Sequence, residues 1–120
     1  ALERLVAQLL VMDKNVVMIA SVPEIGSSVP KVVANNLFWG KTFDIRPRVS
    51  DFEMRQKNTY AILSNIKSTF PDVDIVYPAE VLCGLEHCRI MEGDNPLYFD
   101  DDHLSDNGAT LVFKQVGGLL

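Results

Sequence analysis

The chain has 120 residues, of which 48% are hydrophobic and 22% are charged. This is the composition of a globular protein and not of a disordered one. Lysine and arginine total 11 against 16 acidic residues, for a net charge of -5. The acidic balance disfavours nucleic acid as a partner, because a surface that binds phosphates needs a surplus of cations. No apolar stretch approaches the roughly 20 residues that a membrane-spanning helix needs.

The first part of the chain predicts a helix, a strand and a long loop. The helix covers residues 2–12, whose apolar side chains recur at the spacing of one buried face: Leu2, Leu5, Val6, Leu9 and Leu10. Because this pattern begins at once, with no capping residue before it, we expect the chain to be a fragment of a longer protein. The apolar, β-branched run at 16–20 predicts a strand buried on both faces. Residues 21–30, rich in proline and serine, predict a loop.

Two helices follow in the prediction. Residues 31–38 form a short one. A long helix runs to about residue 69 and opens with a capping box, in which Ser50 caps the helix and Glu53 reaches back. The face expected to be buried consists of Phe52, Thr59, Leu63, Ile66 and Phe70.

The rest of the chain predicts a second buried strand and a final helix. The expected elements are a strand at 73–77, a turn or short helix at 78–82, a tight loop at 83–88, a short edge strand at 89–91, an acidic loop at 94–102 and a helix from the cap Ser105 to about 116. This order of elements predicts an α/β layered fold with a parallel sheet.

The acidic loop holds the strongest candidate for catalysis, since Asp100 precedes His103 by three residues. Histidine can accept and return a proton near neutral pH, and a carboxylate on its other nitrogen stabilises the charged ring. The N-terminal end of the following helix opposes that charge, and the sequence leaves the balance open. The spacing also fits a solvated histidine in a helix-capping loop. A hard-cation site from Asp94, Asp100, Asp101 and Asp102 is a third interpretation, although the spacing of a calcium loop is missing.

A family resemblance rests on three segments. Residues 97–105, Leu-Tyr-Phe-Asp-Asp-Asp-His-Leu-Ser, with Gly108 and Ala109 after them, resemble the last conserved block of SGNH hydrolases, Asp-x-x-His-Leu-Ser. The segment 21–26 and the Pro-Ala-Glu-Val-Leu-Cys segment at 78–83 extend the similarity over nearly the whole chain. Together they resemble the C-terminal SGNH domain of bacterial acyltransferase-3 membrane proteins, which O-acetylate surface polysaccharides such as lipopolysaccharide O-antigen.

The resemblance implies a fold and two site residues. Residues 1–120 would be the C-terminal portion of one three-layer, SGNH-hydrolase-like (flavodoxin-like) α/β domain with a short parallel sheet. His103 would be the general base and Asp100 its orienting carboxylate, whereas Asp101 and Asp102 match no required catalytic position. We expect no metal and no cofactor in this chain, and an acyl donor such as acetyl-CoA for the parent protein.

The chain lacks the Gly-Asp-Ser and Gly-x-Asn blocks that supply the nucleophile and oxyanion donors of SGNH enzymes. Ser21, Ser27 and Ser28 stand outside such a context and are expected to be loop residues. We therefore expect the missing N-terminal half of the domain as a partner and no activity of the isolated chain toward simple esters. Its uncovered sheet edge and helix faces should cause self-association or low stability.

The implied function is transfer of an acyl group, with acetyl expected, to a hydroxyl of a cell-surface polysaccharide or lipopolysaccharide. The parent would carry a transmembrane acyltransferase domain and present this domain on the extracytoplasmic (periplasmic) face of a bacterial inner membrane. Two alternatives stay open. One is an SGNH esterase that hydrolyses acyl esters, and the other is a catalytically silent saccharide-binding domain.

Cys83 and Cys88 are the only cysteines. A loop this short, with Gly84 to permit a turn, allows them to reach bonding distance, but the count alone also fits two free thiols of a cytosolic protein. The extracytoplasmic location that the resemblance implies favours a disulfide. With His87 the two thiols are too few ligands for a zinc site.

Three surface features have plain structural interpretations. Phe38 and Trp39 are expected to anchor packing and not to form a substrate platform. Arg46 and Arg48 are expected in surface ion pairs and not in contact with an anionic saccharide. Residues 24–26 follow the C-terminal end of a predicted strand, so we expect them to border the active site.

Overall fold

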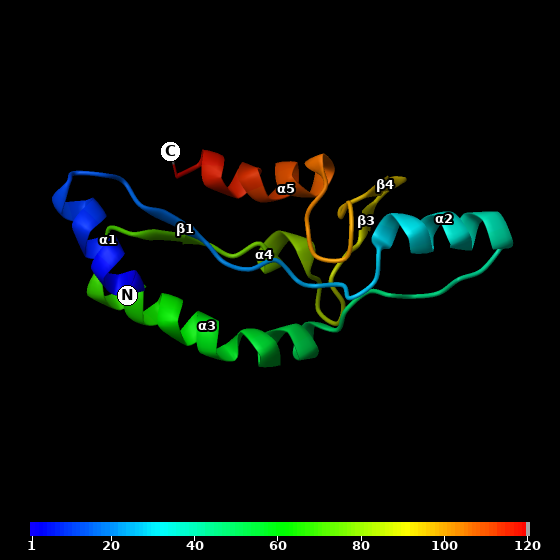
Figure 1. Cartoon of the computed structure of the whole chain (residues 1–120), viewed down its shortest axis with the longest axis horizontal. Coiled ribbons are helices and arrows are strands. Elements are labelled where there is room, and N and C mark those ends of the chain that lie inside the picture. The colour runs from blue at the N-terminus through cyan, green and yellow to red at the C-terminus, as the bar shows by residue number, and fades with distance from the viewer. Residues whose placement is uncertain (120) are drawn as a thin grey trace.

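Two short parallel strands form the centre of the structure. The computed structural model describes residues 1–119. Strand β1 (Val17–Ile19) pairs in parallel with β2 (Asp74–Val76). Helix α5 (Asp106–Gly117) lies on one side of this pair and α3 (Val49–Thr69) on the other (Figure 1). The arrangement of helices around a short parallel sheet confirms the predicted α/β fold class.

Alternate side chains of the two strands face opposite helical layers, because successive residues of a strand point to opposite sides of the sheet. Val17 and Val76 pack in a cluster on the α5 side, whereas Met18 and Ile75 pack on the α3 side. The buried members of the first cluster are Val29, Val76, Leu82, Leu97, Tyr98, Val112 and Val116. Those of the second are Val6 of helix α1 (Leu2–Val11), Ile66 of α3 and Val73.

The prediction that the first strand is buried on both faces is wrong. Ile19 is 49% exposed, and Val17 and Met18 are only half-buried. Within residues 1–119 this sheet has two strands, so β1 has a neighbour on one edge alone. Such a strand carries the apolar sequence of a central strand without the cover that a central strand receives.

Helix α3 ends at residue 69 as predicted, but its start is not the predicted capping box. It begins at Val49 without a side-chain cap, and Ser50 and Glu53 lie inside the helix. The Val49 N–H donates to the carbonyl oxygen of Glu86 at 2.8 Å. A contact from a distant loop therefore satisfies a helix N–H and sets the helix start. Of the predicted buried face, Phe52, Leu63 and Ile66 are buried, Phe70 is half-buried and Thr59 is exposed.

The loop that reaches the start of α3 is closed by a disulfide between Cys83 and Cys88, as the resemblance implied. Inside the loop the Gly84 N–H donates to the His87 carbonyl oxygen at 2.9 Å. The Cys88 N–H donates outward to the Pro47 carbonyl oxygen, also at 2.9 Å. The disulfide loop thus connects the body of the fold to the segment that enters α3.

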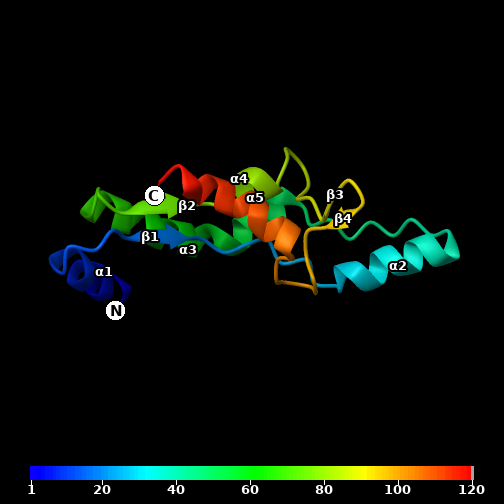
Figure 2. The same cartoon turned by 90° about the horizontal axis from the view of Figure 1, so that it is seen from above.

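Helix α2 (Val29–Trp39) projects from the body at one end of the long axis (Figures 1 and 2). Only Val29 of this helix is fully buried. We call residues 29–48, which comprise α2 and the segment returning from it, the arm. The molecule measures 56 × 27 × 23 Å with a radius of gyration of 16.7 Å, above the about 14 Å of a compact chain of this length. The arm accounts for part of this elongation.

The last third of the chain follows the predicted order except at 89–102, where the edge strand lies at 91–92 and pairs with a second strand at 95–96, inside the predicted acidic loop. Helix α4 (Ala79–Leu82) follows β2, and strands β3 (Met91–Glu92) and β4 (Asn95–Pro96) form an antiparallel pair. Ser105 caps α5 as predicted, since its hydroxyl oxygen accepts a hydrogen bond from the Gly108 N–H at 3.2 Å. Among the described residues, no helix is both long and apolar enough to cross a bilayer.

Candidate active site

The loop that enters α5 is folded into a tight corner, which we define as residues 96–108. Leu97 and Tyr98 are fully buried at its start. The Ser105 N–H donates to the Leu97 carbonyl oxygen at 2.9 Å, and the Ser105 hydroxyl donates to the Pro96 carbonyl oxygen at 2.7 Å. The two ends of the corner are therefore tied to each other, and the residues between them form a closed loop.

Gly108 allows the first turn of α5 to approach this loop. A Cβ at Gly108 would collide with the Leu97 carbonyl oxygen and would crowd the Leu104 side chain. Only glycine permits such a close approach of two backbone segments. This explains physically why a glycine suits this position of the block that resembles SGNH hydrolases.

The corner is also tied to the loop after β1. The Tyr98 hydroxyl donates a buried hydrogen bond to the Pro23 carbonyl oxygen at 2.7 Å. The Ile25 N–H donates to the Asp101 carbonyl oxygen at 2.8 Å. Residues 24–26 therefore lie against the loop that holds the candidate histidine, as the sequence predicted for a segment at the end of a strand.

The structure brings His103 and Asp100 into direct contact. The His103 Nδ1 lies 2.8 Å from Oδ2 of Asp100. The other oxygen of Asp100 accepts the backbone N–H of Asp102 at 2.9 Å and that of His103 at 2.7 Å. Three hydrogen bonds thus hold the Asp100 carboxylate in place. With Nδ1 engaged, Nε2 is the ring nitrogen available for proton transfer.

The sequence did not predict that Asp102 contacts His103. Its Oδ1 also lies 2.8 Å from the His103 Nδ1. The turn that forms when Asp100 accepts the N–H groups two and three residues ahead curls the loop and carries Asp102 against the ring. An aspartate followed two residues later by another acidic residue is the signal that could have indicated this arrangement. The two carboxylates share a single nitrogen, and Asp100 is the better held of the two.

The three side chains also form the arrangement that a metal ion could use. Ligand atoms of Asp100, Asp102 and His103 all lie within 4.8 Å of one another. Asp94 and Asp101, which the hard-cation interpretation included, are not part of this group. Because the Asp100 oxygens already accept hydrogen bonds from the loop, the geometry fits an internal network around the imidazole.

The carboxylates determine the charge preference of the histidine. The hydrogen bond that the Asp100 carboxylate accepts and the charges of Asp100 and Asp102 raise the pKa of His103, and they outweigh the partial desolvation of the ring, which lowers it. Partial burial tends to raise the pKa of Asp100, but the backbone donors and His103 outweigh it and lower the pKa to about 2. Desolvation and the neighbouring acidic groups raise the pKa of Asp102.

The histidine is accessible from solvent. Its side chain is 65% exposed, against 33% for Asp100. The Phe99 ring stacks on the imidazole with 5.4 Å between centroids and 23° between planes. The ring is therefore held on one face by an aromatic side chain and at Nδ1 by carboxylates, while the rest is open.

The candidate serines are not hydrogen-bonded to the histidine, although Ser27 and Ser28 lie in the segment whose Ile25 and Val29 N–H groups donate to the carbonyl oxygens of Asp101 and Asp100. Ser21 is exposed, Ser27 and Ser28 are half-buried, and Ser28 occupies the N-cap position of α2 without a side-chain cap. The structure therefore assembles a histidine and two carboxylates, and among residues 1–119 no serine hydroxyl is hydrogen-bonded to the ring.

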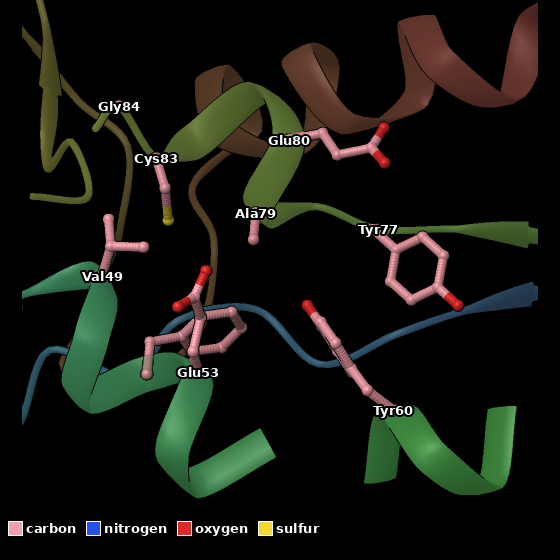
Figure 3. Close-up of a pocket in the computed structure, with 9 residues that line it drawn as sticks. Val49, Glu53, Tyr60, Tyr77, Ala79, Glu80, Cys83 and Gly84 are labelled. Atoms are coloured by element: carbon pink, nitrogen blue, oxygen red, sulfur yellow. The ribbon is translucent and has the colours of Figure 1, made fainter. Parts of the chain in front are cut away.

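A pocket of the described residues is separate from this group. It has a volume of about 380 Å³ and lies between α3 and α4 (Figure 3). Its lining residues are Val49, Phe52, Glu53, Tyr60, Tyr77, Ala79, Glu80, Cys83 and Gly84. Neither His103 nor its two carboxylates line it.

The chain matches a known protein family. The family model described as "SGNH domain (fused to AT3 domains)" matches residues 1–117. Comparisons with curated proteins and with solved structures gave no match.

Proposed function

The chain belongs to the family of SGNH domains fused to AT3 domains, and from this membership we propose that it supplies the base and orienting carboxylate of a Ser-His-Asp triad in a membrane-bound acyltransferase. Fusion to AT3 domains makes the parent a membrane protein. In our proposal the parent takes an acyl group, with acetyl expected, from a donor such as acetyl-CoA. It transfers this group to a hydroxyl of a polysaccharide or lipopolysaccharide on the periplasmic face of a bacterial inner membrane.

The observation that carries the proposal is the contact between His103 and Asp100. Nε2 of His103 accepts the proton of the serine hydroxyl as the serine oxygen attacks the acyl carbonyl. Asp100 stabilises the imidazolium, which returns the proton to the leaving group. In the second step His103 takes the proton of the sugar hydroxyl as its oxygen attacks the acyl-serine, and returns it to the serine. Asp102 adds a second negative charge beside the same imidazolium.

The serine is proposed to come from the N-terminal half of the SGNH domain, outside these residues. The sequence holds no Gly-Asp-Ser block, and within residues 1–119 no serine hydroxyl is hydrogen-bonded to His103. The open side of the imidazole is suited to such a partner, because a histidine that meets its nucleophile on another segment must present Nε2 outward. The same half would cover apolar residues left exposed on α1 and β1, such as Leu5 and Ile19.

The test compares two histidine variants in the intact membrane protein. His103→Ala should reduce acyl transfer to the polysaccharide by at least about a thousandfold, because a triad without its base keeps little catalysis. His87→Ala is the matched control, since it removes the other histidine of this chain, in the disulfide loop. Undiminished transfer by His103→Ala would overturn the proposal.

The same experiment separates the two alternatives. Release of free acid without transfer to a sugar, lost in His103→Ala, would identify an esterase. Saccharide binding without any turnover, unchanged in His103→Ala, would identify a silent binding domain. The isolated chain is proposed to be inactive on p-nitrophenyl acetate and to self-associate in analytical ultracentrifugation. Turnover by the isolated chain that His103→Ala removes would contradict the need for an outside serine.

A further inference from the structure

The end of the arm carries a cluster of exposed apolar side chains, which we call the arm tip (residues 37–43). Leu37, Phe38, Trp39 and Phe43 are 81%, 78%, 66% and 62% exposed. Phe38 and Trp39 contact each other edge to face, with 4.8 Å between ring centroids. The prediction that these two rings anchor packing is therefore wrong. Four large apolar side chains gathered at one exposed point indicate an interaction surface.

The arm tip is held in a defined shape. Gly40 ends α2 in the left-handed conformation, with φ of 62°. The Lys41 N–H donates to the Asn36 carbonyl oxygen at 3.0 Å. The Asn36 side chain donates to the Phe43 carbonyl oxygen at 3.1 Å and accepts the Phe43 N–H at 3.2 Å. The apolar side chains are thus presented by a closed turn, which reduces the conformational entropy lost on binding.

The charge of this part of the chain differs from that of the rest. Residues 29–43 contain Lys31 and Lys41 and no acidic residue, for a formal charge of +2. Since the whole chain has -5, the remainder carries -7. Lys41 lies at the arm tip itself, with its Nζ 5.5 Å from the centroid of the Phe43 ring. Cationic and aromatic side chains therefore occur together at the exposed end.

We propose that the arm tip inserts into the headgroup layer of a phospholipid bilayer, with a preference for anionic lipid. Tryptophan and phenylalanine beside lysine are typical of segments at the membrane interface, and the one acidic residue of the arm, Asp44, is paired with Arg46. The fusion to AT3 domains places the parent protein in a membrane. Because the arm projects at one end of a 56 Å long molecule, the tip can enter the headgroups while the acidic remainder stays away from anionic lipid. This inference is independent of the chemistry at His103.

The single tryptophan of the chain, Trp39, reports directly on the arm tip. Vesicles of mixed phosphatidylethanolamine and phosphatidylglycerol should shift its fluorescence to shorter wavelength. Bromine atoms on the lipid acyl chains should quench it. Lys41→Gln should weaken vesicle binding by about fivefold, the effect of losing one basic residue near an anionic surface, whereas Lys31→Gln, at the core end of α2, should weaken it less. Unchanged emission in excess lipid, with no quenching by brominated lipid, would overturn the proposal.

Matched variants test whether insertion depends on the tip. Leu37→Ser combined with Phe38→Ser keeps the fluorophore and should abolish vesicle binding. Both side chains face solvent, so the fold should persist in circular dichroism. Leu85→Ser, which changes an apolar side chain that is 99% exposed on the disulfide loop, should bind vesicles as the wild type does. The proposal would be overturned if the double variant bound vesicles as well as the wild type does. The same holds if the substitutions only turned a dimer into a monomer and left vesicle binding unchanged.

A photo-crosslink in the intact membrane protein distinguishes lipid from protein as the occupant. Phe38→benzoylphenylalanine should form adducts with phospholipid. A crosslink to the transmembrane domain or to another part of the polypeptide, in place of lipid, would overturn the proposal. This readout does not depend on the folding of the isolated chain, and it is separate from acyl transfer, so it can fail while the proposed function holds.

Discussion

The corner and the arm differ in what holds them. Tyr98 in the corner bonds Pro23, a residue 75 positions away, inside the first hydrophobic cluster. The arm tip is held largely by nearby residues, such as Asn36 with Phe43, seven positions apart. The corner thus inherits its geometry from the core, whereas the arm tip keeps its own shape and leaves its apolar side chains free. A catalytic group needs support from the core, which fixes its geometry. A surface that binds a partner can be held by nearby residues alone.

The ion pair in the arm illustrates local support. Arg46 donates to both carboxylate oxygens of Asp44, at 2.9 and 2.8 Å. These hydrogen bonds hold the pKa of Asp44 well below its usual range, and the predicted ion pair of Arg46 is confirmed. Both side chains are about half exposed, so the pair adds little to global stability. Among the described residues Arg48 has no ion pair, and its backbone pairs with that of His87.

The comparison is tested most strongly by two glycine variants. Gly108→Ala should lower the free energy of unfolding by about 3 kcal/mol or more, because its Cβ would meet the Leu97 backbone, which cannot move aside. Gly40→Ala should cost only about 1 kcal/mol, the strain of a left-handed alanine, since nothing lies within 4 Å of its Cβ. Urea unfolding followed by circular dichroism measures both. Equal losses would show that the arm is as strongly coupled to the core as the corner is.

Removing the disulfide should have a smaller and more local effect. Cys83→Ser with Cys88→Ser should cost about 2 kcal/mol, the chain entropy of a short closed loop. The loop anchors the end of the arm through the N–H groups of Cys88 and Val49. Their amide hydrogens should therefore exchange faster in the variant. The Ser105 N–H, bonded within the corner, should keep its protection, and faster exchange there would show that the corner depends on the disulfide loop.

A pair of tyrosine variants isolates one hydrogen bond of the corner. Tyr98→Phe should cost about 1–2 kcal/mol, because it leaves the buried Pro23 carbonyl without its donor. Tyr60→Phe should be neutral or stabilising, because the Tyr60 hydroxyl is buried with no hydrogen-bond partner. Thermal unfolding of both variants measures the difference. A loss in Tyr60→Phe as large as that in Tyr98→Phe would mean that the loss in Tyr98→Phe does not report the hydrogen bond to Pro23.

The two predicted helix caps show how far sequence reasoning extends. Ser105 and Ser50 both precede a helical pattern, yet only Ser105 caps its helix. The Ser105 hydroxyl also donates to the carbonyl oxygen of Pro96, nine residues away. This contact supports the same helix start that the local pattern predicts. At Ser50 the local pattern fails: the N-cap is Arg48, two residues earlier, where the Val49 N–H donates to the Glu86 carbonyl oxygen. Local patterns predicted the elements, and contacts between distant segments decided where they begin.

The site was predictable only in part for the same reason. The spacing of Asp100 and His103 predicted a pair that could lie together, and the structure brings the two into contact. Asp102 could not be predicted from the resemblance, because its place beside Nδ1 follows from the turn that Asp100 forms. Nor could the exposure of Trp39 be predicted, since an aromatic side chain is apolar whether it faces a core or a partner.

The smallest expected effect concerns the titration of His103. Asp100 and the neighbouring charges raise its pKa above the ordinary value of 6.5. Asp100→Asn should lower this pKa most, Asp102→Asn less, and Asp101→Asn least, following the order of their influence on the ring. NMR titration of the imidazole measures the values, and His103→Ala assigns the signal. A larger fall in Asp102→Asn than in Asp100→Asn would make Asp102 the orienting carboxylate.

The sign of the shift sets the pH dependence. A raised pKa means that stability from the His103 ion pair is fully present at low pH, below the unfolded value, and is lost as pH rises through the folded value. The rate of the proposed acyl transfer should have the opposite pH dependence and rise with pH, because His103 must be neutral to act as a general base. In the intact membrane protein, the acidic limb of kcat/KM should therefore lie above pH 6.5 and move to lower pH in Asp100→Asn, while the maximal rate falls. If the acidic limb stays at the same pH in Asp100→Asn, then Asp100 does not raise the pKa of the group that acts as base. The corner would then hold His103 for a reason other than catalysis.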